Sequence, residues 1–140
     1  MGIGSRAVKL SAVTATVLAG LGLGVPPVFA ASHAVKHTVM FKTEHVRGAR
    51  SAVLAESSGQ VVYTFTGDHR GKAATCTGEC AMIWPLVKGV PVRAHGAKIN
   101  GKFATINGQV TYNGLPLYLF TGAKPAQNHA NAEFKLVPVG

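Results

Sequence analysis

The chain has 140 residues, of which 47% are hydrophobic and 14% charged, with 14 Lys and Arg against 5 Asp and Glu. This length is enough for one modest domain and excludes a multidomain enzyme. The hydrophobic fraction excludes an ordinary disordered tail, which would bury too little apolar surface to offset its ordering entropy.

Residues 1–30 have the pattern of a secretory signal peptide. Arg6 and Lys9 precede an apolar stretch from Ala12 to Val25, and Val28 and Ala30 occupy the −3 and −1 positions of a cleavage site. The alternative is a membrane anchor, but the stretch contains glycines and is shorter than the roughly 20 apolar residues of a span. We therefore expect cleavage after Ala30, no transmembrane span in the mature chain, and a periplasmic or secreted protein.

The mature chain is expected to be basic. It would keep twelve of the 14 basic residues and all five acidic residues, a net charge of +7. Such a charge attracts anionic surfaces, so anionic envelope polymers, or another envelope protein, are the expected partners. Export argues against nucleic acid, as do basic residues that are scattered without interleaved stacking aromatics.

Residues 31–50 are polar and weakly patterned, and we expect them to form a flexible N-terminal arm or a short helix. On a helix, His33 and His37 would share one face and could hold a metal ion. The sequence offers no third ligand beside them, so solvated histidines are the simpler interpretation.

Residues 51–140 are expected to form the folded domain. Ala52–Ala55 and Val61–Phe65 flank Ser57-Ser58-Gly59, a pattern that predicts a β-hairpin. Residues 67–80 are rich in Gly and Thr and are expected to form a loop. Ala81–Val87 is a compact apolar segment that Pro85 should end or bend.

Asn-Gly pairs at 100–101, 107–108 and 113–114 predict two-residue hairpin turns. The last two turns fix a register that places Tyr112 opposite both Phe103 and Leu115. A three-stranded meander follows, with one apolar face made of Phe103, Val110, Tyr112, Leu115 and Leu117.

The meander is expected to be covered on both faces. Pro116 predicts an edge strand or a bulge, because proline cannot donate to a sheet ladder. Tyr118 and Phe120 fall on the face opposite Leu117.

A short repeat relates the two halves of the domain. Tyr-Thr-Phe-Thr-Gly-Asp at 63–68 recurs as Tyr-Leu-Phe-Thr-Gly-Ala at 118–123. The simpler interpretation is that two equivalent strands pack their aromatics into a shared core. The alternative is a ligand site lined by aromatic residues and one acid: Tyr63, Phe65, Asp68, Trp84, Tyr118 and Phe120.

The repeat and two further blocks resemble the bacterial "secreted repeat of unknown function" family. The blocks are Cys-Thr-Gly-Glu-Cys at 76–80 with Trp84-Pro85, and Gln-Val-Thr-Tyr-Asn-Gly-Leu-Pro-Leu-Tyr at 109–118. The resemblance covers residues 51–137 and implies a small exported β-rich domain with no assigned reaction.

The chain departs from the family pattern in its second half. Ala123 stands where the family usually has Asp, residues 125–131 replace a Gly/Asp-rich stretch, and Phe134 stands where Trp is common. A single proline also follows Trp84 where a pair is frequent. If the second Asp binds a ligand or ion in the family, this chain would have lost that use.

Cys76 and Cys80 lie in a chain expected to enter an oxidising compartment, so a disulfide closing a tight loop is the default interpretation. The alternative is a redox or copper-type metal site that recruits Met82 and His69 beside the two thiolates. The C-x₃-C spacing differs from thioredoxin-like motifs, and Ala81 takes the place that histidine has in c-type haem attachment.

The sequence contains little material for catalysis. Asp68 is the single Asp, the Glu residues are dispersed, and no hydrolase or phosphate-binding motif is present. We expect no enzyme activity, no catalytic residues and no cofactor. The predicted fold is mainly β: a small antiparallel meander, barrel-like or sandwich domain built from two related halves.

Overall fold

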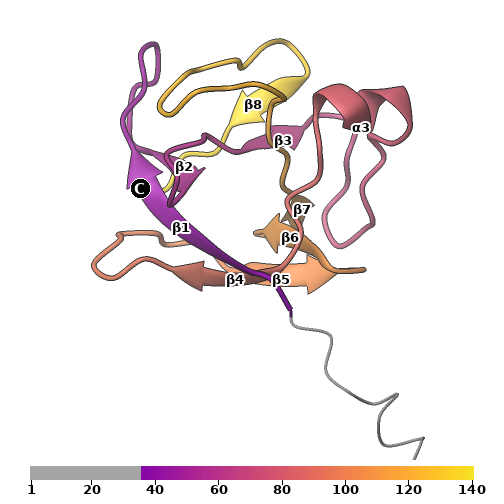
Figure 1. Ribbon diagram of the computed structural model, residues 1–140, viewed down its shortest axis with the longest axis horizontal. Helices are drawn as coiled ribbons and strands as arrows, with labels where there is room; N and C mark the ends of the chain where they lie inside the picture. The colour runs from indigo at the N-terminus through magenta and orange to yellow at the C-terminus, as the bar shows by residue number, and fades with distance from the viewer. Residues whose placement is uncertain (1–35) are drawn as a thin grey trace, which may run out of the picture. The chain divides into compact units, whose positions relative to one another are not determined.

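The structure is a computed structural model that describes residues 36–140. The predicted signal peptide, its cleavage site and His33 lie outside these residues. The described elements, in chain order, are β1 (Thr38–Glu44), β2 (Val53–Glu56), β3 (Tyr63–Phe65), α3 (Glu79–Ile83), β4 (Val90–Arg93), β5 (Phe103–Ile106), β6 (Gln109–Tyr112), β7 (Leu115–Pro116) and β8 (Phe134–Leu136) (Figure 1). No helix among them is long and apolar enough to cross a membrane.

The prediction of a mainly β domain is confirmed. The strands form three small sheets, in the orders β2-β1-β4, β3-β8 and β5-β6-β7, and within residues 36–140 they do not close into a barrel. Most strand pairs are antiparallel, but β1 pairs with β4 in parallel. That pairing joins segments about 50 residues apart, and no local turn signals it.

Strand β1 corrects the prediction of a flexible arm for residues 38–44, while residues 31–35 of that arm lie outside the described residues. Thr38–Glu44 pairs with β2 on one side and β4 on the other. Its side chains alternate at first, with Val39 and Phe41 buried and Met40 exposed. Only these two apolar residues face the core, and because Met40 between them is apolar but exposed, the sequence here shows no alternation of apolar and polar residues.

The hairpin predicted between Ala52 and Phe65 forms only near its turn. The backbone N–H of Glu56 donates to the carbonyl of Gln60 at 2.8 Å, and Ala55 bridges to Val61. Beyond this point the two arms of the hairpin separate, and β3 pairs with β8 instead of β2. The expected loop and apolar segment also contain a short helix, α3, which ends at Ile83, with Trp84 as its C-cap residue before Pro85.

The predicted meander is confirmed in register. Phe103 lies opposite Tyr112, and Tyr112 opposite Leu115. Asn107 and Asn113 both have φ of 51°, as the first position of a type I′ turn requires. Pro116 lies in β7, at the edge of this sheet.

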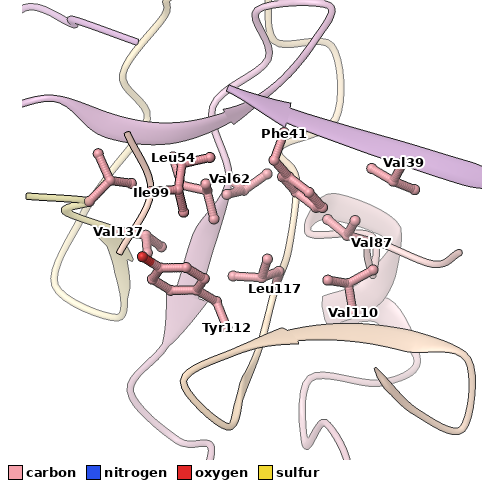
Figure 2. Packing of buried hydrophobic residues seen from close by; sticks show 11 residues of the cluster. Val39, Phe41, Leu54, Val62, Val87, Ile99, Val110, Tyr112, Leu117 and Val137 are labelled. Carbon is pink, nitrogen blue, oxygen red and sulfur yellow. The ribbon is translucent and has the colours of Figure 1, made fainter. Parts of the chain in front are cut away.

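Two buried clusters lie on either side of the 115–120 segment. The aliphatic core includes Phe41, Leu54, Val110, Tyr112 and Leu117, whose side chains converge between β1, β2 and β6 (Figure 2). The aromatic core consists of Val46, Val53, Val61, Tyr63, Cys76, Trp84, Tyr118 and Phe134. Leu117 and Tyr118 therefore point into different clusters, as the alternation along this segment predicts.

Candidate functional site

The two copies of the repeat pair directly with each other. The N–H of Tyr63 donates to the carbonyl of Tyr118 at 2.9 Å, and the N–H of Tyr118 donates to the carbonyl of Tyr63, also at 2.9 Å. Equivalent residues thus exchange both hydrogen bonds, as in a hydrogen-bonded antiparallel pair. Both tyrosines are fully buried.

Asp68 links the first repeat to the tyrosine of the second. Its Oδ2 accepts a hydrogen bond from the Tyr118 hydroxyl at 2.6 Å. Its Oδ1 accepts from the N–H of Thr75 at 2.8 Å and from the Thr75 hydroxyl at 2.7 Å. Asp68 is 7% exposed, so these donors take the place of water around the carboxylate. Burial, and then the neighbouring Asp68, raise the pKa of the Tyr118 phenol.

The buried hydroxyl of Tyr63 has no carboxylate partner, because Ala123 stands in the second repeat where Asp68 stands in the first. The Tyr63 hydroxyl accepts from the N–H of His129 at 2.9 Å and donates to the carbonyl of Gln127 at 3.3 Å. Burial raises the pKa of Tyr63, and the His129 N–H opposes this shift. Backbone groups of the 127–129 loop therefore satisfy the hydroxyl that lacks a repeat-encoded carboxylate.

Trp84 is central to the aromatic core. Its ring stacks on Phe134 with centroids 3.9 Å apart and an interplanar angle of 4°. Phe120 and Tyr63 approach it edge-on, at 4.8 and 5.1 Å. Each such pair stabilises the fold by about 0.5–1.5 kcal/mol, in addition to the contribution from burying its apolar area.

Sequence reasoning missed one aromatic neighbour. The His129 ring stacks on Phe120 at 4.1 Å. His129 lies in the stretch that departs from the family pattern, and no spacing in the sequence relates it to Phe120. His129 is half-buried, like Phe120, which packs against the aromatic core.

All six residues of the predicted ligand site lie together in or against the aromatic core. Tyr63 and Tyr118 are fully buried, Trp84 and Asp68 nearly so, and only Phe65 and Phe120 are half-buried. Their rings pack on one another and on Phe134, and the polar groups of Tyr63, Tyr118 and Asp68 are hydrogen-bonded within the fold. This packing is what the shared-core interpretation expects, and the ligand site stays a prediction.

The predicted disulfide between Cys76 and Cys80 is present, with the Cα atoms 5.3 Å apart. Cys76 is buried in the aromatic core and Cys80 lies on α3, so the bond ties the 67–78 loop to the segment that carries Trp84. In this form neither sulfur is a thiolate, which a copper-type site requires. Met82 is 74% exposed and His69 is exposed, and residues 36–140 contain no group of three His, Cys, Asp or Glu placed to hold a metal ion.

The surface of the domain is strongly cationic. Eleven of the twelve Lys and Arg in residues 36–140 are exposed, whereas only Glu79 and Glu133 of the five acids are. Glu44 forms the one salt bridge of this region, with Lys42 at 3.0 Å. The positive charges thus face solvent with few acidic neighbours to compensate them.

Comparison with known proteins gives one match. Residues 48–88, which hold the first repeat and the cysteine loop, match the family described as a secreted repeat of unknown function. This confirms the family resemblance over that segment, while the resemblance of residues 109–118 remains a prediction. No curated protein and no solved structure matches the chain significantly.

Proposed function

We propose that this chain is an exported, non-catalytic binding protein of the bacterial envelope that associates with anionic polymers. The match of residues 48–88 to a family of secreted repeats supports export. The observation that carries the proposal is the unequal exposure of charge: eleven exposed cations against two exposed acids. A surface of this kind attracts polyanions through long-range electrostatics that salt screens.

The use of the other polar groups supports the non-catalytic part of the proposal. The carboxylate of Asp68 is occupied by Tyr118 and Thr75, and the two cysteine sulfurs are bonded to each other. Asp68 and the two cysteines are therefore engaged in contacts that hold the fold together. The exposed lysines and arginines remain as the chemically distinctive groups of the surface.

The test is salt-dependent retention on isolated bacterial envelopes. The protein purified from an exporting host should bind washed envelopes at low salt and be released by 1 M NaCl, where the Debye length is about 3 Å. A variant with four exposed lysines neutralised should be released at much lower salt: Lys72→Gln, Lys98→Gln, Lys124→Gln and Lys135→Gln.

The matched control carries four substitutions to Gln at exposed neutral positions and should behave like the unchanged protein: Ser51→Gln, Thr66→Gln, Ala73→Gln and Ala132→Gln. Retention that resists salt but yields to detergent would contradict the proposal and indicate an apolar attachment. Absence of retention at low salt would contradict it as well.

A further inference from the structure

A basic cleft of about 450 Å³ lies where three segments meet: residues 36–37 just before β1, residues 88–90 leading into β4, and the β5–β6 hairpin. The N–H of Val90 donates to the carbonyl of His37 at 2.8 Å, and the N–H of Gly89 donates to the carbonyl of Gly108 at 3.0 Å. These bonds make the floor of the cleft a fixed part of the fold. The start of β1 is drawn close to β4 and β5 in Figure 1.

Gly89 is what lets the three segments approach. It has φ of 137°, and a Cβ at this position would overlap the carbonyl oxygen of His37 and the side chain of Val39. Any larger residue would therefore push β1 away from residues 88–90. The close approach places the side chains of Lys36, His37 and Lys88 around one opening.

The lining has one sign of charge and an apolar part. Lys36, His37 and Lys88 are exposed at the cleft, and no acidic residue lines it. Glu56, which does not line the cleft, interacts electrostatically with His37. Val90, 39% exposed, supplies apolar surface, and Thr105 supplies a hydroxyl. The volume falls within the range of about 300–1,000 Å³ that small-molecule sites occupy.

We propose that this cleft binds a small amphipathic oxyanion, with its phosphate or carboxylate head between Lys36 and Lys88 and its hydrocarbon part on Val90. Two ammonium groups act as point charges for such a head, and the Thr105 hydroxyl can donate to it. The site is separate from the diffuse polymer binding proposed above, because it depends on two particular lysines rather than on total charge.

The test is a ¹H–¹⁵N NMR titration of the purified protein with octyl phosphate and octanoate, each below its micelle concentration. Inorganic phosphate and octanol are titrated separately to assess the head and the chain. We expect saturable shifts of the amides of Gly89, Val90 and Gly108 with the amphipathic anions, and weaker binding of either part alone. The stronger of the two anions identifies the preferred head group.

Two variants that remove the same charge distinguish binding at this cleft from electrostatic attraction to the whole surface. Lys36→Gln/Lys88→Gln should weaken the binding at least tenfold, whereas Lys98→Gln/Lys135→Gln, which removes the same charge elsewhere, should leave it within twofold. Equal weakening in both variants, or shifts that do not saturate, would overturn the proposal. Either result can occur whether or not the protein is retained on envelopes, so the two proposals fail independently.

Discussion

The hydroxyl of Tyr118 donates a 2.6 Å hydrogen bond to the carboxylate of Asp68, 50 residues earlier in the chain. The tyrosine comes from the second repeat and the acid from the first, so the side chains that define the repeat hold the two copies together. Tyr118 also exchanges backbone hydrogen bonds with Tyr63, its equivalent in the first copy. The repeat is thus explained by packing of one copy on the other.

Removing the Tyr118 hydroxyl should destabilise the fold more than removing the hydroxyl of Tyr63. Tyr118→Phe withdraws a donor from a buried carboxylate, and a hydrogen bond to a charged group contributes about 1.5–3 kcal/mol. Tyr63→Phe removes bonds to backbone groups alone and should cost about 0.5–1.5 kcal/mol. Urea unfolding of both variants measures the difference in the free energy of unfolding. Equal losses would show that the hydrogen bond to Asp68 stabilises the fold no more than the bonds to backbone groups do.

Loss of the disulfide should weaken the fold without abolishing it. Cys76 and Cys80 are four positions apart, and the loop-entropy relation gives about 2 kcal/mol for so short a ring. The Asp68–Thr75 bonds still hold the preceding loop in a Cys76→Ser/Cys80→Ser variant. Thermal unfolding should show one cooperative transition at a lower midpoint. An unfolded variant would mean that the ring is essential to folding.

Gly108, in the meander, and Gly101, just before it, should differ in their tolerance of alanine. Gly108 has φ of 79° with open space around its Cα, so Gly108→Ala should cost about 1–2 kcal/mol from the left-handed backbone alone. At Gly101 a Cβ would overlap the ring and hydroxyl of buried Tyr112, whose oxygen accepts the Gly101 N–H at 2.7 Å. Gly101→Ala should therefore lower the free energy of unfolding further, since overpacking adds about 1–3 kcal/mol and this hydrogen bond is disturbed. The reverse order in urea unfolding would contradict the packing described around Tyr112.

Stability should fall at alkaline pH. Burial raises the pKa of both Tyr63 and Tyr118 above the ordinary value of 10.0. The folded protein keeps these protons where the unfolded chain loses them, so the contribution is fully present below pH 10 and is lost as pH rises beyond it. Unfolding measured between pH 8 and 11 should show this loss, and Tyr118→Phe should reduce its slope. A slope unchanged by that substitution would argue against the raised pKa of Tyr118.

The meander could be predicted from sequence because two-residue Asn-Gly turns fix the register of the strands that they join. The pairing of β3 with β8 could not, since Phe65 and Phe134 are far apart in the chain and no local signal selects a distant partner. The repeat identified Tyr63 and Tyr118 as equivalent, but not that they pair with each other. The bond from Tyr118 to Asp68 depends on that pairing and appears only when the tertiary structure is known.

The central claim is that the residues of the repeat serve the fold while the exposed cations serve binding. The most direct test is the envelope-retention assay applied to Tyr118→Phe at a temperature where circular dichroism shows it to be folded. We expect the same retention and the same release by salt as for the unchanged protein, although the variant is less stable. A folded Tyr118→Phe protein that no longer binds envelopes would contradict this account, because it would place the aromatic and acidic residues of the repeat in the binding site.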